Sequence, residues 1–224
     1  AGHQIILVSS GAIGMGLGKL PLKSRPEDIP GKQAAAAVGQ CELMYVYDKL
    51  FSEYNHTVAQ ILLTAADIED EGRHRNFNNT MERLLELDAL PIINENDTVA
   101  FEEIVIGDND TLAAIVATSV RADLLILLTD TDGLYTADPH KDPRAKLIPE
   151  IRELTKEVMS IAQGAVTDLG TGGMKTKLHA AKIATESGID MVIANGSDPE
   201  LLYRIVDGEK VGTRFIGRGR YDNQ

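Results

Sequence analysis

The chain has 224 residues and a net charge of −12; 43% of its residues are hydrophobic, 25% are charged and 4% are aromatic, with no tryptophan. This length and composition are typical of a globular enzyme with a sizeable core. The acidic balance argues against a nucleic-acid partner, because binding the phosphate backbone needs a basic face, and the low aromatic content argues against base stacking. No apolar run approaches the roughly 20 residues of a membrane-spanning helix, so we expect no membrane association.

Cys41 is the only cysteine, which excludes an intramolecular disulfide and fits a reducing, cytoplasmic location. It lies in a helical run beside apolar residues, so we expect a buried, inert thiol rather than a nucleophile. The five histidines show no metal-ligand spacing. We therefore interpret them as structural or surface residues and expect no metal-binding side-chain cluster.

Short apolar runs alternate with amphipathic stretches along the chain. The predicted strands cover residues 4–9, 58–63, 90–94, 124–129 and 190–195. The predicted helices cover about 31–54, 65–88, 110–121, 155–162 and 174–187. Nearly continuous apolar strands are covered on both faces, so the alternation predicts one α/β domain over residues 1–224, with a mostly parallel open sheet and helices on both faces. Segment 99–108 breaks the rhythm and is expected to form a small hairpin or an edge strand.

Polar segments follow the predicted strands, at the edge where such sheets bind ligands. The first runs from Ser9 and Ser10 through Gly11 to Gly14. Its glycines let the backbone approach a ligand, and a helix starting there would offer N–H groups to an anion. The spacing lacks the full dinucleotide pattern G-x-G-x-x-G, and a plain strand-to-helix turn is the alternative.

Two clusters of short polar side chains lie between residues 93 and 117. Their members are Asn94, Asn96, Asp97, Asp108, Asn109 and Asp110. An Asx turn and a cap for the following helix explain part of this pattern, but six such residues exceed what one cap needs. The segment also lacks the glycine and terminal glutamate of a calcium-binding EF-hand loop. Amide and carboxylate groups of this kind could bind the α-ammonium group of a substrate.

Two further segments are candidates for ligand contact. Thr129 and Asp130 lie at the carboxyl end of a predicted strand in "LLTDTDGLYTADP", where a purely structural loop is the alternative. In "LGTGGMKTK" a glycine-rich loop precedes a helix beginning near Met174, but its spacing is not that of a P-loop. Lys175 and Lys177 would diverge by about 200° on that helix, so one should bind a ligand and the other face solvent. A flexible loop with two surface lysines is the alternative.

Taken together, the segments resemble the glutamate 5-kinases of the amino acid kinase family. The resemblance is carried, in the family's order, by "VSSGAI", "PIINENDTV", "GDNDTLAA", "LLTDTDGLYTADP", "LGTGGMKTK" and "GT.F", to about Phe215. It implies a three-layer sandwich and transfer of the ATP γ-phosphoryl group to the side-chain carboxylate of L-glutamate, the first step of proline biosynthesis. It also implies Mg²⁺, feedback inhibition by proline and a homo-oligomer.

The resemblance implies a role for each matching position. Ser10, Asp97 and Asn109 would bind glutamate. The nucleotide would be contacted by residues of two segments, namely Thr129, Asp130, Thr171, Gly172, Gly173, Met174, Lys175, Thr176 and Lys177. Lys177 would approach the transferring phosphates, which selects it over Lys175, and Asp110 would organise the catalytic lysines.

Two features depart from the family pattern. The family's first strand carries a lysine that contacts the phosphates, and no such segment precedes Ala1, so we expect weak or no activity without it. The carboxyl-terminal PUA domain of many relatives is also not present in this sequence. The alternatives are a related kinase acting on acetylglutamate, aspartate, carbamate or UMP, or a module that senses amino acids or nucleotides without turnover.

Overall fold

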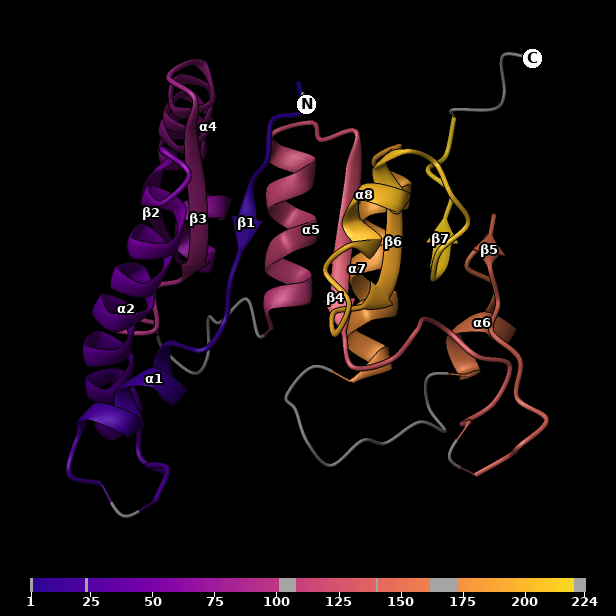
Figure 1. Cartoon of the computed structure of the whole chain (residues 1–224), viewed down its shortest axis with the longest axis horizontal. Coiled ribbons are helices and arrows are strands. Elements are labelled where there is room, and N and C mark those ends of the chain that lie inside the picture. Colours follow the sequence, from indigo (N-terminus) through magenta and orange to yellow (C-terminus); the bar gives the residue numbers. More distant parts are fainter. Residues whose placement is uncertain (1, 23, 101–107, 140, 162–172, 220–224) are drawn as a thin grey trace. The chain divides into compact units, whose positions relative to one another are not determined.

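The computed structural model describes residues 2–22, 24–100, 108–139, 141–161 and 173–219 (Figure 1). The chain divides into two compact units, Ala1–Asn109 and Asp110–Gln224. The expectation of a single domain stays a prediction. Most of segment 99–108, expected to be a hairpin or an edge strand, lies outside the described residues.

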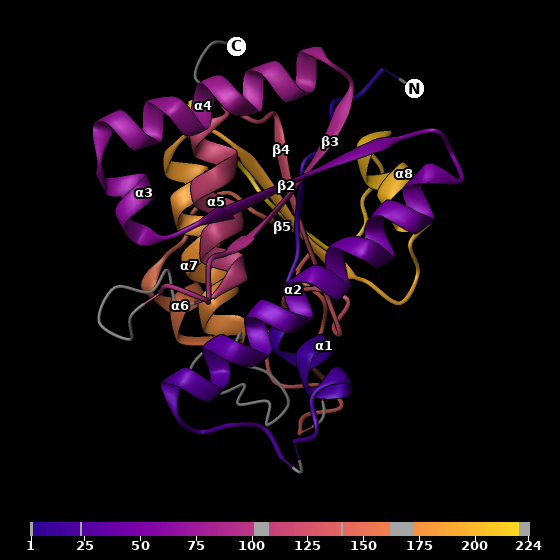
Figure 2. The same cartoon turned by 90° about the vertical axis from the view of Figure 1, so that its left-hand side faces the viewer.

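The first unit is built on a sheet of three parallel strands in the order β1-β3-β2. Its elements are β1 (Leu7–Val8), α1 (Ala12–Lys19), α2 (Ile29–Ser52), β2 (Thr57–Leu63), α3 (Ala65–Glu69), α4 (Glu71–Glu86) and β3 (Ala89–Glu95). Strand β3 is central and buried from residue 91 onward, as a strand covered on both faces should be. Helix α4 packs against β3 and α2 against β2, and Figure 2 shows the two helices on opposite sides of β2.

The single helix predicted over 65–88 is in fact two helices, α3 and α4. Asp70 ends the first in an extended conformation, and its carboxylate then accepts a hydrogen bond from the backbone N–H of Arg73 at 2.8 Å. Thr64 and Asp67 form a capping box at the start of α3. Periodicity alone predicts one continuous helix, but the two N-terminal caps divide the segment into two.

The second unit contains a four-stranded sheet in the order β4-β6-β7-β5. Its elements are α5 (Asn109–Ser119, whose first residue belongs to the first unit), β4 (Leu124–Thr129), β5 (Glu150–Ile151), α6 (Lys156–Ile161), α7 (Met174–Glu186), β6 (Asp190–Asn195), α8 (Leu201–Val206) and β7 (Thr213–Phe215). Strands β4 and β6 are parallel, whereas β7 runs antiparallel to β6. The α/β class is confirmed; α1, α8, β5 and β7 were not among the predicted elements.

Helices cover both faces of the second sheet. Val192 and Ala194 of β6 pack with Ile205 of α8 in one core cluster. Side chains alternate along a strand, so Met191 and Ile193 face the other side, where α7 contacts β6. Figure 2 shows α7 and α8 on opposite sides of β4. The prediction of helices on both faces is therefore confirmed for this sheet.

Helices α1 and α2 pack at unusually close range, with glycines at the contact. A Cβ atom added at Gly39 of α2 would lie 1.6 Å from the carbonyl oxygen of Ala12, and one at Gly16 of α1 would lie 1.9 Å from that of Ala35. Backbone carbonyls on both helices occupy the space that a side chain would need. The crossing of the two helices therefore requires glycine at both positions.

We predict that Gly39→Ala destabilises the protein by about 1–3 kcal/mol, because the added methyl must push α1 away from α2. Gly18→Ala is the matched control, since Gly18 lies in α1 and faces open space. There the methyl should leave stability unchanged or raise it by up to about 1 kcal/mol through helix propensity. Urea unfolding of both variants measures the difference. Equal stability of the two would contradict the close packing of α1 on α2.

Candidate active site

The three strands of the first unit end at one edge of their sheet. Because they are parallel, with Val8 opposite Ile93 and Leu63 opposite Glu95, the polar segments that follow them start side by side. The backbone N–H of Asn96 donates to the carbonyl of Leu63 at 2.7 Å, which extends the pairing beyond β3. The predicted gathering of polar tips is thus confirmed for this unit.

Ser9 and Ser10 differ sharply in their surroundings. Ser9 is buried, and its hydroxyl donates to the Ser10 carbonyl at 3.1 Å and lies 2.8 Å from the hydroxyl of Tyr47 on α2. Ser10 is exposed. Gly11 then adopts φ 106°, a left-handed conformation that favours glycine, and α1 begins at Ala12. The turn thus places Ser10 beside the first N–H groups of α1, and its role in substrate binding stays a prediction.

Amide side chains at this edge are joined into one network. Asn109, the first residue of α5, donates through Nδ2 to the carbonyl of Ser9 at 2.9 Å and to Oδ1 of Asn94 at 3.4 Å. Asn94 is buried and donates in turn to Oε1 of Gln40 at 3.0 Å. The structure therefore brings Asn109 to the Ser9–Ser10 turn across 100 residues of chain.

Asp97 lies in the turn that follows β3. Asn96 begins this turn, since its carbonyl accepts from the N–H groups of Val99 and Ala100 at 3.1 and 3.0 Å and its side chain pairs with the hydroxyl of Thr98. Asp97 is partly buried, and this burial raises the pKa of its carboxyl above the ordinary value. A carboxylate that has lost part of its hydration favours a cationic partner such as an ammonium group.

In the second unit, the start of α7 carries a buried ion pair. The Lys177 ammonium lies 3.1 Å from Oδ2 of Asp110, and the Thr176 hydroxyl donates to the same oxygen at 2.8 Å. Both charged side chains are largely buried, with 10% and 18% of their surface exposed. Such a pair loses hydration on both sides, so its geometry, with Thr176 as a further donor, decides whether it is stable.

The two lysines of this segment point in different directions, as predicted. Lys177 is buried against Asp110, whereas Lys175 is exposed. Gly173 stands immediately before α7 in an extended conformation, and Met174 is the helix's first residue. Thr171 and Gly172, also predicted to contact a nucleotide, lie outside the described residues.

Thr129 and Asp130 lie at the carboxyl end of β4, beside the end of β6 at Asn195. The Thr129 hydroxyl donates to the Asp130 carboxylate at 3.1 Å, and Asp130 is exposed. Sequence reasoning did not single out Asp132, whose carboxylate accepts from Asn195 at 2.9 Å and from Tyr135 at 3.0 Å. Burial, followed by the bond to Asp132, raises the pKa of the Tyr135 hydroxyl.

The largest departure from the sequence predictions concerns α2. Cys41, expected to be buried, is exposed, so that prediction was wrong. The neighbouring residue Gln40 is the buried one, because it faces the sheet while Cys41 is turned about 100° away. The signal for the missed residues was present: Gln33, Gln40 and Tyr47 recur every seven residues, which places them on one face of a helix.

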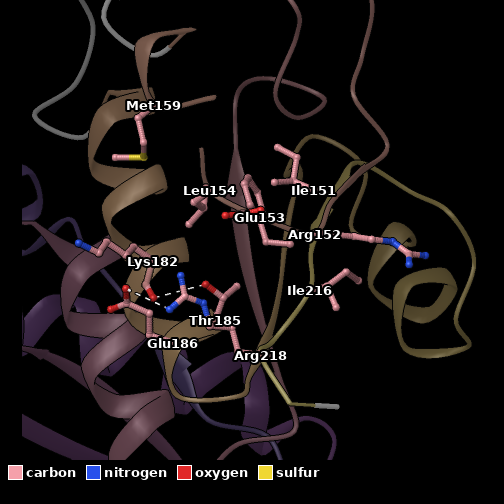
Figure 3. Close-up of a pocket in the computed structure, with 11 residues that line it drawn as sticks. Ile151, Arg152, Glu153, Leu154, Met159, Lys182, Thr185, Glu186, Ile216 and Arg218 are labelled. Atoms are coloured by element: carbon pink, nitrogen blue, oxygen red, sulfur yellow. Dashed lines mark hydrogen bonds and ion pairs between the residues drawn. The ribbon is translucent and has the colours of Figure 1, made fainter. Parts of the chain in front are cut away.

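A cavity of about 130 Å³ lies in the second unit, near the last turns of α7 and strands β5 and β7 (Figure 3). Lys182, Thr185 and Glu186 line it from α7, Ile151 lines it from β5, and Arg218 lies beside Glu186, with which it forms an ion pair at 3.9 Å. None of the predicted site residues contributes to its wall. We place a candidate site in each unit instead: in the first unit at the strand ends, where the oriented amides lie, and in the second unit at the start of α7, where the buried charges lie.

The described residues include no helix that is long and apolar enough to cross a membrane. Within these residues, no three histidine, cysteine or carboxylate side chains lie close enough together to hold a metal ion.

We predict that Asp97→Asn raises the free energy of unfolding at pH 7. Burial makes the carboxyl hold its proton more tightly in the folded chain than in the unfolded one, so stability falls as pH rises above the ordinary carboxyl pKa of about 3.9. Asparagine removes this loss. The advantage of the variant should therefore shrink as pH is lowered towards about 4, which urea unfolding across this range measures. A variant less stable than wild type at pH 7 would contradict the assigned burial cost.

The chain is similar to known proteins over most of its length. The model of the amino acid kinase family matches residues 1–195. A glutamate 5-kinase of Clostridium perfringens is 52% identical over 221 residues, covering 97% of this chain and 82% of the relative. One from Clostridium tetani is 55% identical over 214 residues, covering 96% and 80%. A longer one from Caldanaerobacter subterraneus is 54% identical, with 96% of this chain but 58% of the relative covered.

Solved structures share the fold at low sequence identity. Carbamate kinase from Giardia lamblia, bound to AMP-PNP, matches with a TM-score of 0.62 and 17% identity over 96% of this chain and 85% of its own. Isopentenyl phosphate kinase of T. acidophilum matches with a TM-score of 0.61 and 18% identity over 94% and 83%. On the family match and on identities above 50% along nearly the whole sequence, the chain belongs to the amino acid kinase family.

Proposed function

We propose that this chain is a glutamate 5-kinase, which transfers the γ-phosphoryl group of ATP to the side-chain carboxylate of L-glutamate. The observation that carries the proposal is the 52% and 55% identity to glutamate 5-kinases over 97% and 96% of the chain. The low-identity structural neighbours act on other substrates, so the fold alone does not choose the acceptor.

In this proposal the first unit binds glutamate. The exposed hydroxyl of Ser10, beside the start of α1, and the Asn109 amide are hydrogen-bonding partners for an amino acid. Asp97 offers a partly buried carboxylate, and this burial raises its pKa. An α-ammonium group there would restore the charge balance and lower that pKa again.

The second unit binds the nucleotide. Backbone N–H groups at the start of α7 suit phosphate oxygens, and Lys177 brings a cation that Asp110 and the helix hold in one place. Residues Gly173 to Lys177, together with Thr171 and Gly172, form the proposed phosphate loop. Thr129 and Asp130, at the end of β4, contact the nucleotide in the same proposal.

The reaction brings anions together, so positioning and charge compensation are the main tasks. A glutamate carboxylate oxygen attacks the γ-phosphorus, the bond to the β-phosphate oxygen breaks, and glutamyl 5-phosphate and ADP leave. The acceptor is already ionised at neutral pH, so no general base is needed. Lys177 neutralises charge that develops on the phosphates, and Asp110 holds the Lys177 ammonium group in position.

Mg²⁺ bound to the nucleotide would offset further phosphate charge. In such sites the ion is held mainly by phosphate and water oxygens and by one or two carboxylates, and Asp110 of α5, whose carboxylate accepts from Thr176 at the start of α7, fits this role. Feedback inhibition by proline at the glutamate site, a homo-oligomeric state and a cytoplasmic location complete the proposal.

The decisive experiment measures ADP release in Mg²⁺-ATP with glutamate and, separately, with acetylglutamate, aspartate, carbamate and UMP. Release that requires glutamate and is suppressed by proline supports the proposal. ADP release with another acceptor would contradict the glutamate assignment but agree with membership of the amino acid kinase family. Binding of ATP and glutamate without ADP release, in a protein that also carries the family's first lysine strand, would favour a sensing module.

We predict that Lys177→Met lowers kcat by at least about 100-fold, whereas Lys182→Met, at an exposed position further along α7, changes it less than about threefold. Removing Lys177 alone also leaves the Asp110 charge buried without its cation, which costs stability. The double variant Lys177→Met/Asp110→Asn removes both charges and should recover thermal stability but not turnover. Recovery of turnover in the double variant would mean that Lys177 is only structural.

A further inference from the structure

Four amide side chains of the first unit form a hydrogen-bonded chain that runs in one direction, hereafter the amide chain. Asn109 donates to Asn94, Asn94 to Gln40, and Gln40 to Oε1 of Gln60 at 3.3 Å. Each nitrogen donates to the oxygen of the next amide. Such chains polarise their members in the same sense, so each bond strengthens its neighbour.

Backbone groups with fixed hydrogen-bonding roles set this direction. The N–H of Glu95 can only donate, and it binds Oδ1 of Asn94 at 2.9 Å, so Nδ2 of Asn94 must face Gln40. The carbonyl of Ser9 can only accept, so Asn109 must turn its nitrogen towards it. The orientation of both asparagines therefore follows from the backbone.

The consequence for Asn109 is chemical. Both of its hydrogen bonds within the described residues use Nδ2. Its planar amide therefore carries Oδ1 on the side away from Ser9 and Asn94. That oxygen is an acceptor, which suits an ammonium group and not a carboxylate.

We propose that Gln40 is a positioning residue for amino-acid binding, since its Oε1 holds Asn94, and through it Asn109, in the orientation that offers a carbonyl oxygen to the substrate α-ammonium group. This inference rests on the proposed function. Gln40 is only 7% exposed, so water cannot replace it as the acceptor for the buried Asn94. Without that acceptor, Nδ2 of Asn94 is left buried and unpaired, and any shift of the side chain towards another partner weakens the bond that its Oδ1 accepts from Asn109.

The test is Gln40→Met, which keeps the length of the side chain and removes both polar atoms. KM for glutamate, and Kd measured by calorimetry, should rise about 5- to 10-fold, while kcat and KM for ATP change less than about twofold. Gln40→Glu retains the acceptor for Asn94, and the exposed Gln60 amide can turn to donate to it. This variant should bind glutamate within about twofold of wild type.

Gln33→Met is the matched control, because Gln33 lies seven residues earlier on the same face of α2 and donates to the carbonyl of Ala100 instead. Equal glutamate KM in Gln40→Met and wild type would overturn the inference, as would equal weakening by Gln40→Met and Gln33→Met. A fall in kcat without a change in KM would do the same.

A substrate-free measurement separates this inference from the proposed function. The side-chain NH₂ signals of Asn94 and Asn109 in NMR spectra should shift and exchange faster with water in Gln40→Met, but not in Gln33→Met. Unchanged signals overturn the amide chain whatever the substrate. A wild-type protein that shows these signals but does not respond to glutamate overturns the proposed function alone.

Discussion

Parallel pairing of β1, β2 and β3 is the constraint on which the chemistry of the first unit depends. Parallel strands end at the same edge, so the polar residues after Val8, Leu63 and Glu95 meet although they are far apart in the chain. The register matters as much as the direction. A shift of β3 by one residue would turn Asn94 to the other face of the sheet, away from Gln40.

The buried polar groups of the two units have the same physical logic. Burying Lys177, Asp110 or Asn94 costs free energy of hydration, which only well-aligned hydrogen bonds or ion pairs offset. A core of apolar residues would be at least as stable, so stability alone does not account for these groups. What they gain is a fixed geometry: an ammonium group held at the start of α7, and an amide whose oxygen cannot exchange places with its nitrogen.

The sequence predicts the repeated pattern well and the non-local contacts poorly. Strands β2, β3, β4 and β6 follow from continuous apolar runs, with observed ends within a residue or two of the predicted ones. Strand β7 is only three residues long, which is too short for an alternating pattern to reveal it. Helix α1 was hidden by three glycines, of which Gly16 is needed for the contact with α2 rather than for a loop.

The divergence of Lys175 and Lys177 follows from helix geometry alone, and so it was predictable. That Lys177 pairs with Asp110, 67 residues away, is not a property of either segment; the family resemblance supplied it. The amide chain was predictable in part. The seven-residue spacing of Gln33, Gln40 and Tyr47 indicates a polar face on α2. Nothing in the local sequence shows that this face meets Asn94 of β3.

Helix α2 joins packing to chemistry in consecutive residues. At Gly39 its backbone approaches the carbonyl of Ala12, two residues after Ser10, and at Gln40 its side chain enters the amide chain. Because neighbouring helix positions point about 100° apart, one turn can press on α1 and reach the strand ends at the same time. A displacement of α2 would therefore move the Ser10 turn and the Asn94 amide together. Helix α2 supplies none of the proposed ligand-binding residues, but because of this coupling its position must be as accurate as that of the residues that bind the ligand.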